Sequence, residues 1–483
     1  MNDLRGRSLS PRQSHRIDMT LNNYKTIHFI GIGGIGVSAL ARYFLSKGYK
    51  VSGSDLADSP IIRDLTKEGA VIRIGHSSGN VKNLKNTLII HSQAVNSDNS
   101  EMKRILKMGL EHRSYPEAVG ELSKEFKMVA IAGAHGKSTT TALVALIMIE
   151  AGLDPTVIVG TKLKEFNNSN FRLGKSEYLV LEADEYGGAF WNYHPFISGI
   201  TNIDREHLDF YKNFTGVKKS FSRFLANHKA GSKIIFNDFD KNLSGVISKA
   251  KSLKRIPISN ISAITKNKIK RALKIPGKHN QLNAFVAYSV AKGLGISDKI
   301  ILKSISKFKG VWRRMEYKGK LKVLSFKLKN KVILFDDYAH HPNEIKATLQ
   351  GLKEKYPKNK LICVFQPHQA KRLKALFKDF TRAFSDADKT IIFPIYKVAG
   401  REKSRGNNRY SSKSLAKYIK GSIYLENPKK GLNKAIFDVI KGYKPPHPTV
   451  GCGGKSPVTI VMMGAGDIID YSQAILLSGL DKI

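Results

Sequence analysis

The sequence predicts an α/β protein built from three domains with parallel sheets. The chain has 483 residues, more than one ordinary domain holds, and 41% of them are hydrophobic, enough to build real cores. Short apolar runs alternate with helical patterns along the chain, which is typical of βαβ units. Two glycine-rich loops each follow an apolar run and precede a helical stretch. Such loops hold phosphates at helix N-termini, so we expect a phosphate-binding protein.

We expect the three domains to follow a short tail. Residues 1–22 carry arginines but no apolar segment, which predicts a basic disordered tail rather than a secretory signal. The first domain, 23–122, contains apolar runs such as "TIHFI" and "TLIIHS", and the second, 123–310, opens on "KMVAIAG". The third, 311–483, contains "KVILFDD", "LICVFQP" and "VTIVMMGAG". Within it, the proline- and glycine-rich segment 443–457 predicts an irregular loop before the last strand.

Composition narrows the class of protein. No uninterrupted apolar stretch of about 18 residues occurs, so we expect no membrane span. The two cysteines, Cys363 and Cys452, give no disulfide framework and fit a reducing cytoplasm. The formal net charge of +42 is spread through every segment of the chain. It therefore favours anionic substrates but does not predict nucleic acid as the primary partner.

The first glycine-rich loop lies in "HFIGIGGIGVSALARYF". Gly31, Gly33 and Gly36 have the G-x-G-x-x-G spacing. Asp55 follows about 20 residues later, where dinucleotide-binding folds place a ribose-binding acid. The pattern has two interpretations, a nicotinamide-dependent dehydrogenase or a loop that holds some other diphosphate at a helix N-terminus.

The second glycine-rich loop, in "VAIAGAHGKSTTTALVALIMIE", predicts a nucleoside triphosphate site. Gly133 and Gly136 flank a turn whose N–H groups can hold phosphates, Lys137 can neutralise them, and the Ser138 hydroxyl can bind magnesium. The generic pattern has four residues between its glycines and this loop has two. The alternative is a glycine-rich turn with a surface lysine. Most dehydrogenases have no use for a second phosphate loop.

Two acidic clusters support a triphosphate site because each follows an apolar run. The alternative for each cluster is an ordinary solvated loop. Ligands gather at the carboxyl ends of parallel strands, and Mg²⁺–triphosphate needs carboxylates and an imidazole there. The two clusters are Glu182, Asp184 and Glu185, followed by Asp204, Glu206, His207 and Asp209.

With these residues placed, the chain from about residue 24 to its end resembles the Mur ligase family of peptidoglycan synthesis. The matching stretches occur in family order: "HFIGIGGIG", "GSD", "GAHGKSTTT", "EADE", "NIDREHLDFY", "GKHNQLNA", "GVWRRMEYKG", "DDYAHHPNEI", "FQPH" and "GAGDI". The resemblance implies an N-terminal Rossmann-like domain for a UDP-sugar, a central P-loop ATPase domain and a C-terminal Rossmann-like domain for an amino acid.

The resemblance also implies a reaction. The lactyl carboxylate of UDP-N-acetylmuramate attacks the γ-phosphate of ATP, and the amine of L-alanine then attacks the acyl phosphate. Mg²⁺ is the expected ion, with Mn²⁺ as an alternative, and the enzyme would be a cytoplasmic monomer or homodimer. Three alternatives stay open: a recycling ligase that attaches a whole tripeptide, a nicotinamide-dependent dehydrogenase, and a degenerate ligase that only binds its substrates.

Site residues follow from the matching motifs. The resemblance assigns UDP-sugar binding to Gly31, Gly33, Gly34, Gly36, Ser54, Asp55 and His76. It assigns ATP binding to Gly133, Ala134, His135, Gly136, Lys137, Ser138, Thr139, Asn280, Asn283, Arg314 and Asp337. It makes Lys137, Glu185 and His207 catalytic, and makes Ser138, Glu185 and His207 the metal ligands. The amino acid would meet Tyr338, His340, His368 and Arg372, any of which is alternatively an ordinary strand-end residue.

The chain departs from the family pattern at several positions. Ala134 and Ser138 stand where two threonines are expected, and Ser138 keeps the needed hydroxyl. Gln369 stands where an arginine is expected after "FQPH", which leaves Arg372 as the nearby guanidinium. Several family members carry a carbamylated lysine after the His207 motif, and "KKSFSRFLANH" offers none at that place. That absence fits the alanine-adding or the tripeptide-adding branch, and "FQPH" favours alanine.

Overall fold

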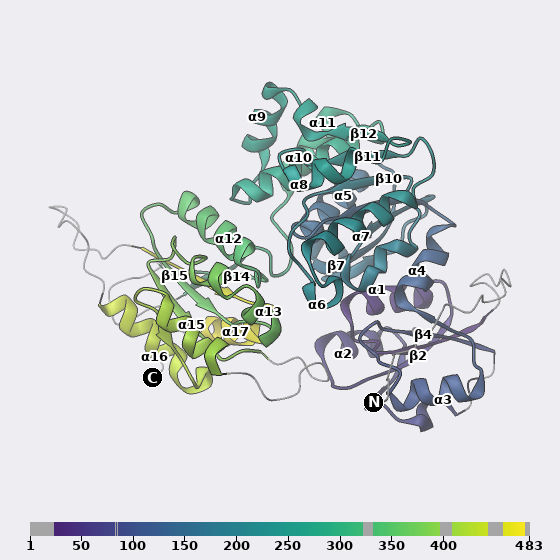
Figure 1. The fold of residues 1–483 in the computed structure, drawn as a ribbon, viewed down its shortest axis with the longest axis horizontal. Coiled ribbons are helices and arrows are strands. Elements are labelled where there is room, and N and C mark those ends of the chain that lie inside the picture. Colours follow the sequence, from purple (N-terminus) through teal and green to yellow (C-terminus); the bar gives the residue numbers. More distant parts are fainter. Residues whose placement is uncertain are drawn as a thin grey trace, which may run out of the picture.

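The strands of a computed structural model form three sheets, one in each part of the chain (Figure 1). The structure describes residues 24–82, 84, 86–321, 332–396, 408–442 and 457–478. The tail predicted at 1–22, Cys452 and nearly all of the loop predicted at 443–457 lie outside these residues. Among the described residues, no helix is both long and apolar enough to cross a membrane.

The N-terminal part carries a parallel five-stranded sheet in the order β3-β2-β1-β4-β5. Its strands are β1 (Thr26–Ile30), β2 (Lys50–Asp55), β3 (Val71–Ile74), β4 (Thr87–His91) and β5 (His112–Ser114). Its helices are α1 (Ile35–Ser46), α2 (Pro60–Lys67), the 3₁₀ turn η2 (Ser78–Val81), α3 (Ser100–Met108) and α4 (Tyr115–Ser123). The strand order reverses between β1 and β4, and such a reversal is where doubly wound sheets bind ligands. This part is the predicted Rossmann-like fold.

The central part carries a seven-stranded sheet in the order β12-β11-β10-β6-β9-β7-β8. Its strands are β6 (Lys127–Ala132), β7 (Thr156–Leu163), β8 (Ser169–Arg172), β9 (Tyr178–Glu182), β10 (Ile197–Ile200), β11 (Lys233–Phe236) and β12 (Lys254–Pro257). Its α-helices are α5 (Lys137–Glu150), α6 (Leu208–Tyr211), α7 (Phe214–Ala226), α8 (Lys241–Ile247), α9 (Ala263–Ala272), α10 (Lys278–Gly293) and α11 (Asp298–Lys307), and its 3₁₀ turns are η3 (Lys164–Phe166), η4 (Tyr186–Asn192) and η5 (Ile258–Asn260). Because β6 lies in the middle, the loop after it opens at the centre of the sheet edge.

The edge strand β8 joins the central part to the N-terminal part. It runs antiparallel to β7 and packs with it on α1. The Asn170 amide donates to the Ser38 hydroxyl at 3.0 Å and accepts from the Arg42 guanidinium at 2.7 Å. Since Asn170 and Arg42 are buried and paired, these bonds fix the orientation of the two parts. This antiparallel edge strand was not predicted from the sequence.

The C-terminal part carries a six-stranded sheet in the order β13-β14-β18-β15-β16-β17. Its strands are β13 (Glu316–Leu321), β14 (Val332–Asp337), β15 (Lys360–Phe365), β16 (Lys389–Ile392), β17 (Ile423–Tyr424) and β18 (Val458–Met463). Its helices are α12 (Pro342–Lys355), α13 (Ala370–Ala375), α14 (Phe377–Thr381), the 3₁₀ turn η6 (Asn408–Tyr410), α15 (Ser412–Tyr418), α16 (Pro428–Lys441) and α17 (Ile468–Ser478). The central strand β18 is buried throughout, as a continuous apolar run covered on both faces must be. The edge strand β13 is antiparallel to β14, as β8 is to β7 in the central sheet.

A carboxylate is buried where β14 meets α17. The Asp336 side chain is 2% exposed and accepts from the Ser472 hydroxyl at 2.8 Å, while its Oδ1 atom has no hydrogen-bond partner among the described residues. The Lys318 ammonium lies 3.7 Å away. Burial outweighs this ammonium and raises the pKa of Asp336 to about 6.

We predict that Asp336→Asn becomes progressively more stable than the wild type as pH rises. The folded state binds this proton more tightly than the unfolded state, whose pKa is about 3.9, so the wild type loses stability as pH rises from about 4 to above 6. Two pKa units correspond to about 2–3 kcal/mol. Thermal unfolding at pH 4.5 and 7.5 measures the difference. The exposed Asp438→Asn is the matched control, and a pH-independent difference for Asp336→Asn would contradict the assignment.

Candidate active site

The loop between β6 and α5 has room only for glycine at two positions. Gly133 and Gly136 have φ angles of 137° and 82°, in the left-handed region. A Cβ atom at Gly133 would lie 2.0 Å from the Thr201 hydroxyl, and one at Gly136 would lie 2.2 Å from the Asn283 amide oxygen. The turn therefore holds its backbone against two neighbouring elements, at the N-terminus of α5, where N–H groups can bind a phosphate.

Lys137, the first residue of α5, is held in a buried ion pair. Its ammonium lies 2.7 Å from a Glu185 oxygen and 3.5 Å from Asp184, and it donates to the Gly133 carbonyl at 2.8 Å. Burial opposes its charge, but the Glu185 and Asp184 carboxylates raise the pKa of Lys137 above its usual value. Burial likewise opposes ionisation of Glu185, but Lys137 and His207 lower the pKa of Glu185 to about 2. Both partners are therefore charged before any ligand binds.

The donor atoms around this pair suit a divalent cation. Asp184, Glu185 and His207 bring one ligand atom each within 4.8 Å of one another. The Glu185 Oε1 atom is buried, has no hydrogen-bond partner among the described residues and lies 3.4 Å from His207 Nε2. Carboxylate oxygens are the ligands that Mg²⁺ prefers. Ser138, a predicted ligand, instead donates its hydroxyl to Glu182 at 2.9 Å.

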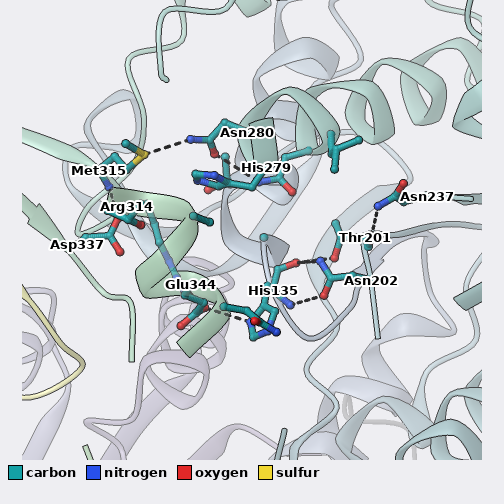
Figure 2. A pocket seen from close by; sticks show the side chains of 17 residues that line it. His135, Thr201, Asn202, Asn237, His279, Asn280, Arg314, Met315, Asp337 and Glu344 are labelled. Atoms are coloured by element: carbon teal, nitrogen blue, oxygen red, sulfur yellow. Dashed lines mark hydrogen bonds and ion pairs between the residues drawn. The ribbon is translucent and has the colours of Figure 1, made fainter. Parts of the chain in front are cut away.

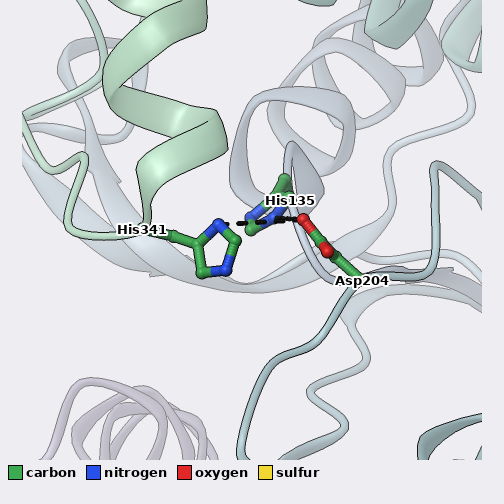
Figure 3. Close-up of side chains that lie close together, drawn as sticks. All are labelled: His135, Asp204 and His341. Carbon is green, nitrogen blue, oxygen red and sulfur yellow. Dashed lines mark hydrogen bonds and ion pairs between the residues drawn. The ribbon is translucent and has the colours of Figure 1, made fainter. Parts of the chain in front are cut away.

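A second cluster joins the loop between β6 and α5 (residues 133–136, hereafter the phosphate loop) to the C-terminal part (Figure 3). His135 Nε2 lies 2.8 Å from an Asp204 oxygen, and His135 Nδ1 lies 3.3 Å from Glu344 on α12. The His341 ring lies 4.9 Å from the His135 ring between centroids. Burial opposes protonation of His135, but Asp204 and Glu344 raise the pKa of His135 to about 10. His135 is thus an imidazolium that bridges two parts, and a cation bound at this cluster would have to displace its proton.

A cavity of about 230 Å³ lies on one side of the phosphate loop, between α10 and α12 (Figure 2). Asn280 on α10 lies on one wall, near Met315, and Arg314 and Asp337 of the C-terminal part lie on another (Figure 2). Asn283 on α10 also lines this cavity. The Asp337 carboxylate accepts the N–H groups of residues 315 and 339 at 2.7 and 2.8 Å. Predicted ATP residues on its walls are His135, Gly136, Thr139, Asn280, Asn283, Arg314 and Asp337. Wall residues that sequence reasoning missed include Thr201, Asn202, His279, Leu282, Met315 and Glu344.

A larger cavity of about 600 Å³ is lined by other residues of the same loop and is bounded by all three parts of the chain. The N-terminal part contributes the start of α1 and Tyr115, and the central part contributes Lys137, Ser138 and His207. Predicted amino-acid residues on its C-terminal walls are Tyr338, His340, His368 and Arg372, which makes the predicted set complete there. Glu185 does not line it, since it is buried behind Lys137.

The predicted UDP-sugar residues separate into two groups. Gly34 and Gly36 line the large cavity, and a Cβ atom at Gly36 would lie 2.8 Å from the Tyr115 hydroxyl. Residues of the predicted set that do not line it are Gly31, Gly33, Ser54, Asp55 and His76. Asp55 supports the loop, since its carboxylate accepts from Gly33 N–H at 2.8 Å. The Ser54 hydroxyl instead donates to Glu101 at 2.6 Å and lies 3.1 Å from His76 Nδ1. Ser92, Gln93 and Tyr115 also line this cavity and were not predicted from the sequence. The only sequence signal for Ser92 is that it directly follows strand β4.

Comparison with known proteins identifies the family. The model described as Mur ligase family, catalytic domain, matches residues 26–127, the Mur ligase middle domain matches 131–291, and the glutamate ligase domain of Mur ligases matches 313–441. The UDP-N-acetylmuramate--L-alanine ligase of Clostridium botulinum strain Okra is 36% identical over 94% of this chain and 98% of its own length. The enzyme of the same name from Clostridium acetobutylicum is 37% identical over 94% and 97%.

Solved structures agree with these matches. The UDP-N-acetylmuramate-alanine ligase of Thermotoga maritima superposes with a TM-score of 0.72, at 25% identity over 94% of this chain and 98% of its own. A murein peptide ligase from Psychrobacter arcticus gives 0.64, at 24% identity over 95% and 99%, and shares the fold. The chain therefore belongs to the Mur ligase family.

Proposed function

We propose that this protein is an ATP-dependent ligase that joins L-alanine to the lactyl carboxylate of UDP-N-acetylmuramate, with Mg²⁺ as its metal. We take the two substrates from the names of the relatives, which are UDP-N-acetylmuramate–alanine ligases. The observation that carries the proposal is the large cavity, where the start of α1, the phosphate loop and the C-terminal side chains meet. A three-substrate ligase needs such a meeting point, because its reacting groups must come together in one place.

The first step brings anions together. A carboxylate oxygen of the sugar attacks the γ-phosphorus of ATP, the bond to the bridging oxygen breaks, and ADP leaves. Lys137 is charged and fixed before the step, so it can stabilise the transferring phosphoryl group without reorganisation. Asp184, Glu185, His207 and the Ser138 hydroxyl would hold Mg²⁺, which supplies positive charge to the phosphate oxygens when bound.

The second step joins the amino acid. The amine attacks the acyl carbonyl, the bond to the phosphate oxygen breaks, and inorganic phosphate leaves. His340, His368 and Arg372, all of the C-terminal part, line the cavity. Burial lowers the pKa of His340 to about 4, with Arg372 adding to the effect, so this imidazole is neutral beside an incoming ammonium. Neutral imidazole and guanidinium suit the two ends of a zwitterionic amino acid.

Further assignments belong to the same proposal. We place the domain boundaries at 23–122, 123–310 and 311–483, and the activity in the cytoplasm as a monomer or homodimer. A tripeptide in place of alanine is the second candidate, since murein peptide ligases share this fold. The relatives that align along the whole chain at 36–37% identity bear the alanine name, which favours alanine. A dehydrogenase would leave the loop between β6 and α5 without a role.

Phosphate release tests the proposal directly. We expect ATP-dependent release with UDP-N-acetylmuramate and L-alanine, and a higher kcat/KM for L-alanine than for L-alanyl-γ-D-glutamyl-diaminopimelate. Glycine and serine should react less efficiently, because one methylene in a pocket is worth only about 1–3 kcal/mol. A higher kcat/KM for the tripeptide would move the protein to the recycling branch. Micromolar binding of NAD(H) without ATP turnover would refute the ligase assignment.

Lys137→Ala should lower kcat by about 10²–10³, the usual cost of losing a preorganised charge at such a centre. Binding of UDP-N-acetylmuramate, measured by calorimetry, should stay nearly unchanged because its diphosphate is assigned to the start of α1. Lys127→Ala is the matched control, since Lys127 lies on the same strand-loop-helix unit and pairs with Glu177 at the surface. A Lys137→Ala enzyme with more than about a tenth of the wild-type rate would show that this loop is not the ATP site.

Glu185→Gln should raise the Mg²⁺ concentration needed for half-maximal rate by about tenfold or more, since it removes the buried anion of the cation cluster. Titration of Mg²⁺ at saturating ATP measures this. Glu150→Gln is the control, because Glu150 lies at the far end of α5 and pairs with surface lysines. An unchanged Mg²⁺ requirement in Glu185→Gln would remove Glu185 from the metal site.

A further inference from the structure

The Arg372 guanidinium has one nitrogen paired with a carboxylate and another without a hydrogen-bond partner among the described residues. Its Nη2 atom lies 3.1 Å from Glu206 Oε2, and its side chain is only 10% exposed. Its Nη1 atom is buried and has no hydrogen-bond partner among the described residues. A buried guanidinium donor without an acceptor is costly, so this edge is suited to a ligand that brings an acceptor.

Arg372 lies at the junction of two cavities. It lines the large cavity together with His340 and His368, and it also lines a cavity of about 280 Å³ whose walls include Arg205 and Lys371. It lies on α13, a helix of six residues in the C-terminal part. An arginine side chain has many rotamers, so a specific partner is needed to hold its guanidinium in one orientation.

Glu206 supplies the missing constraint from another part of the chain. It belongs to the loop after β10 in the central part, and its side chain is 5% exposed. Its carboxylate accepts a hydrogen bond from Arg372 Nη2. Both side chains are nearly buried, although both also line the two cavities, so the pair fixes the plane and the direction of the guanidinium fork.

We propose that Glu206 is a positioning residue, which holds one edge of Arg372 so that the other edge binds the carboxylate of the amino-acid acceptor. This inference rests on the proposed function, in which the acceptor carries a carboxylate. Glu206 need not touch the acceptor in this role. Its own negative charge would repel the acceptor if it acted alone, so positioning and repulsion predict opposite effects of removing it.

A neighbouring ion pair offers a matched control. Arg205, next to Glu206 in sequence, pairs with Asp379 on α14 at 3.1 Å, and both side chains are about half exposed. This pair joins the same two parts of the chain but does not contact Arg372. If Glu206 served only to hold these parts together, the nucleotide would also be affected, because its cavity spans the same two parts.

The test compares KM values in Glu206→Ala, Glu206→Gln and Asp379→Asn, with the acceptor that the wild type uses most efficiently. We expect Glu206→Ala to raise the acceptor KM by about tenfold or more, the usual cost of losing a charge-assisted hydrogen bond, and to change the ATP KM by less than about twofold. Glu206→Gln keeps a side-chain oxygen that can accept a hydrogen bond from Arg372, so its KM for the amino-acid acceptor should be close to that of the wild type. Asp379→Asn should leave both KM values unchanged.

Several outcomes would overturn the proposal. An unchanged or lowered acceptor KM in Glu206→Ala would mean that Glu206 does not position Arg372. Equal rises in the acceptor and ATP KM values would mean that it only holds the parts together. A raised Mg²⁺ requirement with an unchanged acceptor KM would mean that it acts through His207.

A double-variant cycle gives an independent check. If Glu206 acts through Arg372, adding Glu206→Ala to Arg372→Ala should lower kcat/KM for the acceptor no further. If the fold-losses in kcat/KM of the two single variants multiply in the double variant, the two residues act independently and the proposal is contradicted. The test uses whichever acceptor the wild-type enzyme converts with the highest kcat/KM. If that acceptor is the tripeptide, the alanine assignment is refuted, but the role of Glu206 can still be tested with the tripeptide.

Discussion

The site depends on one buried ion pair, between Lys137 at the start of α5 and Glu185 after β9. Burying two charges is expensive, and the cost is offset only when both are well paired. Here Lys137 also donates to the Gly133 carbonyl, and the Glu185 carbonyl accepts the Tyr211 hydroxyl. The pair therefore ties the phosphate loop to two other segments of the central part. A lysine held in this way keeps its charge at the helix N-terminus whether or not a phosphate is present.

Glu344 plays the corresponding role between parts of the chain. As the third residue of α12 it closes a capping box, accepting the N–H group of His341 at 3.3 Å. Its carboxylate also lies 3.3 Å from His135 on the phosphate loop and 3.5 Å from Arg314. One helix-capping carboxylate thus joins the C-terminal part to the loop that would hold the phosphates. The same group therefore makes contacts beside the cavity between α10 and α12 and caps the first turn of α12.

The sequence predicted well what local patterns determine and poorly what distant partners determine. Both glycine-rich loops lie between a strand and a helix, because each apolar run, turn and helical stretch is contiguous in sequence. The antiparallel edge strands β8 and β13, "SNFR" and "EYKGKL", carry little apolar pattern and owe their place to their neighbours. Ser54 looked available for a ligand, but it donates to Glu101 on a helix 47 residues away. Glu344 had no local signal beyond its helix start, since His135 and Arg314 approach it from other segments.

Different residues of the loop between β6 and α5 line the two cavities, and this arrangement bears on the proposed first step. His135, Gly136 and Thr139 face the cavity between α10 and α12, while Ala134, Lys137 and Ser138 face the cavity shared by all three parts. In the proposed function, a nucleoside in the first cavity and a sugar carboxylate in the second would both lie next to a phosphoryl group held at this loop. In-line displacement requires the attacking and leaving oxygens to lie on opposite sides of phosphorus. Binding the two substrates through different residues of one loop would keep the carboxylate and the leaving ADP apart, with Lys137 on the wall of the cavity assigned to the carboxylate.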